Sequence, residues 1–449
     1  MSISPFDSAL YRDLFTDREV ATLFSDSAEI RAMLLVEGML ARVQGDLGTI
    51  PAESAAFIHR SAQEVQIDPA ALAQATGQNG VSVPALVAAF RKAMEAPDHA
   101  QYAHWGATSQ DIIDTGLALR LRQALALIGA RADRLLDALA RLAQAHAETP
   151  MVARTYGQTA APTSFGAVAA SWGWPFLAHL DRLAALRARV LAVSLSGAAG
   201  TGAALGHEAA ETRVRLAEAL KLEDPGRSLH TTRDHVGELA GWLTLATGST
   251  GKIGEDLLLL AQSDTGEVRF AGSGESSTMP QKQNPVGASV LVALARHVQA
   301  LNGAVQGAAL HRQQRDGAAW FTEWLSLPAM VMGAAKGLAL AADLAEGLKV
   351  QAGAMAGRLN APLGLIHAEA LSFALATHLP RPEAQARVKA ACKEAVATGM
   401  PLPELLQAAY PGLDLAAAVV PGAMPGQAPR EARDFAAAVA ARRKNGAEG

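Results

Sequence analysis

The stretch of the sequence with the most evident chemical potential is residues 272–285, Gly-Ser-Gly-Glu-Ser-Ser-Thr-Met-Pro-Gln-Lys-Gln-Asn-Pro. Its glycines and serines supply backbone N–H donors, Lys282 adds a cation, and Asn284-Pro285 precedes a long apolar run that predicts a helix. Because helix N-termini carry partial positive charge, this combination predicts an anion site with a carboxylate as the expected ligand. A serine here can transfer a proton if the lysine, the loop amides and the helix end stabilise its alkoxide. The alternative is a flexible surface turn in which Asn284 caps the helix.

A second polar segment, His104 to Asp111, lies just before the first long predicted helix. His104 and the hydroxyl groups of Thr108 and Ser109 can bind a carboxylate through charge and hydrogen bonds. The alternative is structural, with Ser109 or Asp111 capping the helix and His104 merely exposed.

Two further polar segments lie where loops or helix ends are expected. Thr155 and Gln158 can hydrogen-bond a substrate or satisfy the backbone of a helix end, and both interpretations stay open. The glycine-rich residues 197–202 do not match the phosphate-binding pattern G-x-x-x-x-G-K-[ST]. We therefore expect close backbone packing there rather than nucleotide binding.

Residues that could bind a metal or act as a nucleophile elsewhere are scattered. The 12 histidines form no H-E-x-x-H or comparable pair, so no metal is expected. Cys392 is the only cysteine, which excludes an intrachain disulfide and a cysteine-rich zinc site. Its alanine-rich surroundings favour a core position.

Long helices must position these segments. From Asp114 to Leu142 apolar residues recur every three or four positions with charged residues largely between them, which predicts one long amphipathic helix. Further long runs cover residues 164–195 and 234–262, and another starts at Asn284-Pro285. Shorter helices precede them, one beginning at Asp68-Pro69. The pattern predicts a helical bundle, with domain boundaries near residues 105 and 350.

The composition limits the class of protein. The 449 residues include 39 Lys and Arg against 43 Asp and Glu, and the net charge of −4 argues against a protein built mainly to coat nucleic acid. Hydrophobic residues make up 50% and charged residues 18%, which suits a large core and excludes a disordered chain. We expect no signal peptide and no membrane span, since Arg296 and His297 interrupt the longest apolar candidate. A soluble, cytoplasmic protein is expected.

Residues 276–285 match S-S-x-M-P-x-K-x-N-P, the signature of the fumarase/aspartase superfamily. His104 to Thr115 resembles the superfamily's H-x-G-x-T-S-x-D segment, Arg154 to Gly166 its R-T-x-x-Q-x-A-x-P-T segment, and Gly197 to Gly206 its Gly-Thr segment. The motifs occur in the expected order. The resemblance implies an all-α fold of three helical domains with a central long-helix bundle, over residues 1–104, 105–350 and 351–449.

Within the superfamily the chain is most similar to the bacterial 3-carboxy-cis,cis-muconate cycloisomerases, or lactonising enzymes. The opening Phe6-Asp7 and the stretch from Arg315 to Trp320 followed by Glu323-Trp324 resemble theirs. Tyr156 stands where adenylosuccinate lyases carry a histidine that protonates a leaving group, and a lactonisation expels no separate leaving group. The resemblance therefore implies lactonisation of 3-carboxy-cis,cis-muconate, in the protocatechuate branch of the β-ketoadipate pathway.

The chain departs from related sequences at three positions. Gln281 and Gln283 replace the histidine and arginine of M-P-H-K-R-N-P, which weakens the case for a phosphorylated substrate such as adenylosuccinate. Glu275 stands where glycine is common. An adenylosuccinate lyase or related fumarate-releasing lyase, and a non-catalytic structural relative, are the alternatives.

The resemblance also implies the roles of individual residues. Ser277, Lys282 and His104 are implied as catalytic, with Ser277 moving the proton at carbon. The implied substrate-binding residues are Thr108, Ser109, Thr155, Tyr156, Gln158, Ser276, Met279, Asn284 and Arg315. No metal or organic cofactor is implied. The implied partners are a small polycarboxylate substrate, neither nucleic acid nor membrane, and further copies of the chain in a homotetramer whose active sites each draw on three subunits.

Overall fold

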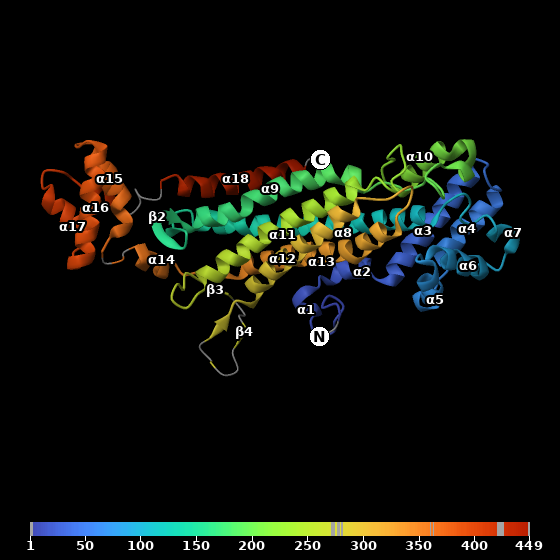
Figure 1. Ribbon diagram of the computed structural model, residues 1–449, viewed down its shortest axis with the longest axis horizontal. Coiled ribbons are helices and arrows are strands. Elements are labelled where there is room, and N and C mark those ends of the chain that lie inside the picture. The colour runs from blue at the N-terminus through green and yellow to red at the C-terminus, as the bar shows by residue number, and fades with distance from the viewer. Residues whose placement is uncertain are drawn as a thin grey trace. The chain divides into compact units, whose positions relative to one another are not determined.

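The computed structural model of the chain describes residues 3–270, 274–275, 279, 282–359, 361, 363–419 and 426–447. Helices dominate these residues, which confirms the all-α fold (Figure 1). The five longest helices are α8 (Ser109–Ala145), α9 (Phe165–Val190), α11 (Asp234–Leu260), α12 (Val286–Ala308) and α13 (Gly317–Gly347). The long helices predicted from residue periodicity correspond to α8, α9, α11 and α12.

Shorter elements fill the rest of the described chain. The helices before α8 are α1 (Arg12–Phe15), α2 (Arg18–Leu23), α3 (Asp26–Asp46), α4 (Ala52–Glu64), α5 (Pro69–Asn79), α6 (Val83–Ala93) and α7 (Pro97–Ala100). The later ones are α10 (Ala209–Leu220), α14 (Ala352–Leu359), α15 (Ala368–Ala376), α16 (Arg381–Thr398), α17 (Leu402–Ala409) and α18 (Ala428–Ala447), with 3₁₀ turns η1 (Ala203–Glu208), η2 (Leu365–His367) and η3 (Ala416–Val419). The strands are β1 (Pro150–Thr155), β2 (Gln158–Ser164), β3 (Val268–Phe270), β4 (Gly274–Glu275), β5 (Gln283–Asn284) and β6 (Leu348–Val350).

Local sequence explains where several helices begin and which face they bury. Asp68 accepts a hydrogen bond from the Ala70 N–H at 3.0 Å and Pro69 is the first residue of α5, as predicted. In α8 the periodic apolar residues Leu121, Leu125 and Ile128 are all buried.

The chain divides into two compact units, and both are made from separated stretches. The first unit comprises Met1–Ala132, Ala178–Gly251 and Val290–Ala339, and the second comprises Asp133–Leu177, Lys252–Ser289 and Leu340–Gly449. Each of the five longest helices therefore supplies residues to both units. This division leaves the domain boundaries predicted near residues 105 and 350 untested.

In the first unit, helices approach one another closely where glycine or alanine faces the neighbour. On α3, a Cβ at Gly38 would lie 2.5 Å from the Ala62 Cβ of α4, and one at Gly45 would lie 2.3 Å from the Ala55 Cβ. α3 and α4 therefore form a tight antiparallel pair. This pair matters for the site because α3 carries two buried polar residues, Glu37 and Gln44.

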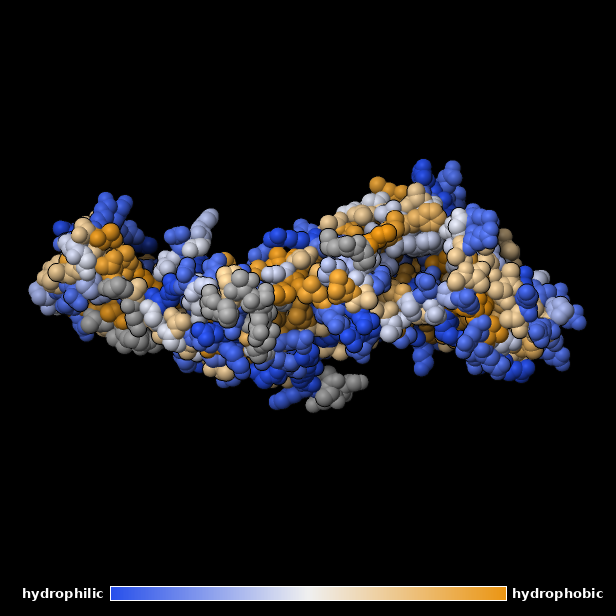
Figure 2. Space-filling view, turned by 90° about the horizontal axis from the view of Figure 1, so that it is seen from below, coloured by the Kyte–Doolittle hydropathy of each residue, from blue (hydrophilic) through white to orange (hydrophobic). Residues whose placement is uncertain are grey.

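In the second unit, the β1–β2 hairpin follows α8, and the C-terminal helices form their own core. Val152 of the hairpin packs with Leu359 and Ile366 in a small apolar cluster. Helices α15, α16 and α17 bury a separate apolar cluster, against which Cys392 packs while remaining partly exposed. Figure 2 shows apolar surface over these helices, where Phe373 and Val396 are exposed.

The prediction that the run after Pro285 is the longest apolar candidate for a membrane span is wrong. α13 is long and apolar enough to cross a bilayer by length and composition, because it contains an 18-residue window with few charges. However, 67% of that window of α13 is buried inside the structure, as in the core helix of a bundle. α13 accordingly packs against α11 and α12 in the first unit, with Gly333 facing Val298 and Gly337 facing Thr250.

Candidate active site

The predicted site residues are distributed over both units. The first unit contains His104, Thr108, Ser109 and Arg315. The second contains Thr155, Tyr156, Gln158, Met279, Lys282 and Asn284. Ser276 and Ser277, together with Gln281, lie outside the described residues.

His104 lies in the loop between α7 and α8, and it is not merely exposed, contrary to the structural alternative. Its Nδ1 lies 2.7 Å from Oε1 of Glu37, and the two side chains are 20% and 1% exposed. Burial lowers the pKa of His104, but the charge of Glu37 and its hydrogen bond outweigh this effect. The pKa of His104 therefore lies above its ordinary value, which favours an imidazolium that can bind an anion.

Asp111, in the first turn of α8, ties two loops together from a fully buried position. One carboxylate oxygen accepts hydrogen bonds from the backbone N–H groups of Thr108 and Gly197 at 3.0 and 2.9 Å. The other oxygen accepts a hydrogen bond from the Ser196 N–H at 2.9 Å and lies 2.8 Å from Nε2 of His230. Asp111 thus serves the helix end, as the structural alternative proposed, and also anchors the glycine-rich run beside it.

The glycine-rich run packs closely against the His104 loop, as expected. Gly106 has φ +73°, and a Cβ there would lie 2.7 Å from Leu205 Cδ2 and 2.9 Å from the Ala204 oxygen. Gly197 has φ +72°, and a Cβ there would lie 3.3 Å from the Gly106 oxygen. Side chains at these positions would force the two loops apart.

Arg315 joins this loop cluster from the segment that precedes α13. Its Nη2 donates to the Thr108 hydroxyl at 3.2 Å and to the Ala198 carbonyl at 3.1 Å, and its Nε donates to Gln110 Oε1 at 3.1 Å. The structure therefore brings together Thr108 and Arg315, two predicted substrate-binding residues 207 positions apart. Ser109 is the first residue of α8 and is half-buried.

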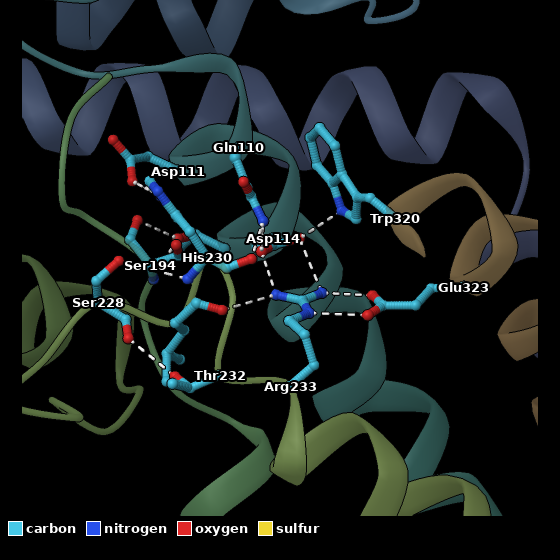
Figure 3. A network of polar contacts seen from close by, with 12 residues as sticks. Gln110, Asp111, Asp114, Ser194, Ser228, His230, Thr232, Arg233, Trp320 and Glu323 are labelled. Carbon is cyan, nitrogen blue, oxygen red and sulfur yellow. Dashed lines mark hydrogen bonds and ion pairs between the residues drawn. The ribbon is translucent and has the colours of Figure 1, made fainter. Parts of the chain in front are cut away.

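Gln110 connects this cluster to a buried charge network, since its Nε2 donates to Asp114 Oδ2 at 3.4 Å (Figure 3). Arg233 donates to Asp114 Oδ2 at 2.6 Å and to both oxygens of Glu323 at 2.9 and 2.5 Å. Trp320 Nε1 donates to Asp114 Oδ1 at 3.2 Å. Of the residues that carried the resemblance in the stretch 315–324, Trp320 and Glu323 thus serve the core, whereas Arg315 is exposed.

In the second unit, Thr155 and Gln158 lie at the turn of the β1–β2 hairpin, so the interpretation as a helix end is wrong. They face each other across the antiparallel pair, with Tyr156 and Gly157 between them at φ +53° and +73°. Tyr156 is 104% exposed. The β-branched residues on either side of Tyr156-Gly157 were the signal for this hairpin.

Arg154, which opens the same sequence motif, is used to hold the hairpin. Its two terminal nitrogens each donate to one oxygen of Glu267 at 2.8 Å, and the Glu267 side chain is fully buried. Such a bidentate pair combines two charge-assisted hydrogen bonds and fixes the orientation of the guanidinium. In this motif Arg154 anchors the hairpin, and the four residues that follow it, Thr155 to Gln158, are exposed.

The described part of the signature segment leads directly into α12. Asn284 pairs with Gly274 in the β4–β5 ladder and is half-buried, and α12 begins at Val286. The Lys282 N–H donates to the Met279 oxygen at 2.9 Å, and both side chains are exposed. Lys282 and Asn284 thus precede a helix N-terminus, as predicted.

Comparison with known proteins assigns the family. The sequence family described as lyase matches residues 8–300. The chain belongs to this lyase family. It is 40% identical over 392 residues to 3-carboxy-cis,cis-muconate cycloisomerase of Pseudomonas aeruginosa. The matched region covers 86% of this chain and 85% of the relative.

Solved structures of this lyase family have the same fold. The 3-carboxy-cis,cis-muconate lactonizing enzyme of Pseudomonas putida superposes with a TM-score of 0.90 and 37% identity, covering 96% of this chain and 99% of that one. A fumarate lyase of Mesorhizobium sp. BNC1 gives a TM-score of 0.88 at 33% identity, covering 94% and 98%. The resemblance to the fumarase/aspartase superfamily is therefore confirmed.

Sequence reasoning missed several residues that organise this lyase. Glu37 and Arg233 received no role, and Asp111 was considered only as a cap. A charge at Glu37, within the otherwise apolar run Met33 to Leu40, was the available signal, because a buried charge needs a partner. The partner itself, His104, could not be read from sequence spacing.

Proposed function

We propose that this lyase is a cycloisomerase that converts 3-carboxy-cis,cis-muconate into its γ-lactone. The observation that carries the proposal is the agreement in sequence and fold with enzymes of that name over most of the chain. The intact Ser277, Lys282 and Asn284 support a catalytic protein over a structural relative. The proposed role is in the protocatechuate branch of the β-ketoadipate pathway.

The proposed reaction is an intramolecular addition. One substrate carboxylate oxygen attacks a carbon of the conjugated diene and forms the C–O bond of the lactone. The displaced π electrons move onto the activating carboxylate as an enediolate, which Lys282, Asn284 and loop amides would stabilise. Ser277 would then deliver a proton to the adjacent carbon, forming the C–H bond, and would act as the base in the reverse direction. No group leaves the molecule.

The remaining site residues would bind the substrate carboxylates. The candidate cations are His104, Arg315 and Lys282. Thr108, Ser109, Thr155, Gln158, Ser276 and Met279 would supply further contacts. Tyr156, in place of the histidine that protonates a leaving group in adenylosuccinate lyases, favours lactonisation over fumarate release.

We also propose a cytoplasmic homotetramer whose active sites draw segments from three subunits. The fully exposed Tyr156 supports this assembly, as does Leu325 of α13, which is 81% exposed on a long helix of the first unit. The assembly can be tested by refolding together two impaired variants, His104→Gln and Ser277→Ala, and measuring activity at low substrate concentration. If the two residues of one site come from different subunits, about a quarter of the sites regain both intact residues. Activity no higher than that of the two variants measured separately, in a mixture that forms hybrid oligomers, contradicts the shared site.

The function is tested by an ultraviolet assay with 3-carboxy-cis,cis-muconate and, in parallel, adenylosuccinate. Loss of the diene absorbance with formation of lactone supports the proposal, and fumarate released only from adenylosuccinate supports the alternative lyase. The Ser277→Ala variant should lose about 10²–10⁴-fold in turnover. Near-normal turnover by this variant removes Ser277 from the mechanism.

A further inference from the structure

Glu37 is a buried carboxylate in the interior of α3. Its side chain is 1% exposed, and within the described residues only one of its oxygens has a hydrogen-bond partner, Nδ1 of His104 at 2.7 Å. Burying an ionised carboxylate is costly unless the partner carries the opposite charge. The environment of Glu37 therefore favours the imidazolium form of His104.

The contact also fixes how the imidazole ring can be used. Because Nδ1–H donates to Glu37, Nε2 is the ring nitrogen left for a ligand. In the imidazolium form Nε2 carries a proton, so it can donate a charge-assisted hydrogen bond to a carboxylate. His104 has φ +63°, a backbone conformation that is uncommon outside glycine and that the loop must hold in place.

The position of the loop does not depend on Glu37 alone. Gln44, two turns further along α3, donates from Nε2 to the Trp105 oxygen at 2.8 Å. Arg91 of α6 donates to the Ala103 oxygen at 2.7 Å. These two bonds hold the backbone on both sides of His104, so what Glu37 adds is the charge and the hydrogen bond to the ring.

The charges around His104 act in opposite directions. Burial lowers its pKa most strongly, and the positive charge of Arg91 on α6 also lowers it. Glu37 on α3 raises it through charge and hydrogen bonding, and Asp111 on α8 raises it further. The net direction is upward, so removing the charge of Glu37 should lower the pKa of His104 below its ordinary value.

We propose that Glu37 is the positioning residue of His104, holding its Nδ1 proton so that Nε2–H is reserved for one carboxylate of the substrate. This inference rests on the proposed function, which supplies the polycarboxylate. Glu37 acts only through His104 and touches no reacting atom.

The test compares Glu37→Gln, which keeps a hydrogen-bond acceptor and removes the charge, with Gln44→Ala, which removes a neutral tether from the same loop and helix face. The ring of His104 is followed by NMR during a pH titration, with its signal assigned by its loss in His104→Gln. Glu37→Gln should lower the titration midpoint by about one pH unit or more, whereas Gln44→Ala should leave it near that of the wild type.

Kinetics provide a second readout. At pH 7.5 the Glu37→Gln variant should raise KM for 3-carboxy-cis,cis-muconate about 10-fold, with a much smaller change in kcat and with recovery of KM at lower pH. The double variant Glu37→Gln/His104→Gln should be no worse than His104→Gln alone. Equal losses for Glu37→Gln and Gln44→Ala at all pH values, or an unchanged midpoint, overturn the proposal.

Failure of the proposed function and failure of the role of Glu37 give different experimental results. Absence of lactonisation by the wild-type protein overturns the proposed function, while the titration of His104 needs no substrate and still decides whether Glu37 controls the ring. Should Glu37→Gln fail to fold, the wild-type titration suffices: a midpoint at or below the ordinary value of about 6.5 overturns the proposal.

Discussion

The loop before α8 and the turn of the β1–β2 hairpin both carry predicted substrate-binding residues, but the protein holds them differently. The loop is tied by the buried Glu37 and Gln44 of α3, the buried Asp111 of α8 and the exposed Arg91 of α6. At the turn, Arg154 is anchored to Glu267, but the next residues, Thr155 to Gln158, are exposed.

This difference separates two ways of building a binding site. In the loop, the folding of the first unit itself orients His104 and Thr108 before any ligand arrives, so the cost of ordering them is met during folding. At the hairpin turn, ordering of the exposed Tyr156 must come from a contact outside the second unit, supplied under the proposed function by substrate or by another subunit. Substitutions should therefore affect stability strongly in the first region and weakly in the second.

The largest effect is expected for Arg233→Met, which removes the cation between two buried carboxylates behind the loop. The uncompensated charges of Asp114 and Glu323 should lower the free energy of unfolding by about 3–5 kcal/mol, measured by urea denaturation. The control is Arg189→Met, which breaks a pair with Glu238 whose side chains are 52% and 43% exposed. It should cost at most about 1 kcal/mol. Similar losses in both variants would remove the distinction between buried and exposed charges.

Two glycines with the same backbone conformation sharpen the comparison. Gly106 in the loop and Gly157 in the turn both have φ +73°, but an added Cβ meets Leu205 and the Ala204 backbone only at Gly106. Gly106→Ala should destabilise by about 2–3 kcal/mol, through both strain and the clash. Gly157→Ala should cost only the strain, about 1 kcal/mol. Equal values in thermal or urea unfolding would show that the close approach of the two loops is not rigid.

The free energy of unfolding, measured over a range of pH, distinguishes the charged His104 of the loop from the neutral His179 of the bundle. Burial, and then Arg182, lower the pKa of His179 to about 4, and Nδ1 of His179 accepts from Arg182. Between this pKa and the ordinary value, the unfolded chain binds more protons, so stability falls as pH falls. From pH 6.5 to pH 5 this group should remove about 2 kcal/mol.

The variant His179→Gln should lose correspondingly less stability over the same interval. His207→Gln, at a side chain that is 93% exposed, serves as the control and should follow the wild type. His104 has the opposite sign: its raised pKa adds stability below about pH 6.5, and this is lost as the pH rises through the folded value. A wild-type profile that is flat from pH 6.5 to pH 5 would contradict the depressed pKa of His179.

The smallest effect, and one of opposite sign, is expected at the hairpin turn. Tyr156→Asn places at φ +53° a residue that tolerates this conformation, and it should raise the free energy of unfolding by up to about 1 kcal/mol. If Tyr156 binds substrate, kcat/KM should fall at the same time. Tyr156→Phe keeps the strain and should leave stability unchanged. Destabilisation by Tyr156→Asn would mean that the tyrosine ring packs against another part of the assembly.

Much of the fold could be predicted because its signals are local. The three-to-four-residue periodicity of α8 and the Asp68-Pro69 start of α5 depend on neighbouring residues alone. The β1–β2 hairpin was missed because its strands are short and lie between long helices, where a helix end was the simpler interpretation. α13 was not predicted because so few charged residues alternate with its apolar ones that no amphipathic pattern marks it.

The candidate site was predictable as a set of motifs but not as a set of contacts. The signature at residues 276–285 and the order of the polar segments identified the family, since they depend only on residue type and spacing. The partners of His104 and Arg233 lie 67 and 90–119 residues away in sequence. No local pattern encodes such pairings.

The sequence by itself therefore determined four of the five longest helices, the family and the residues available for chemistry. Only the tertiary structure decided which of them are ordered by the protein: His104 by Glu37, Thr108 by Asp111 and Arg315, and the hairpin by Arg154 and Glu267. The physical reason is that helix periodicity and capping act over one or two turns, whereas a buried charge must find its counter-charge wherever the packed helices bring one within reach.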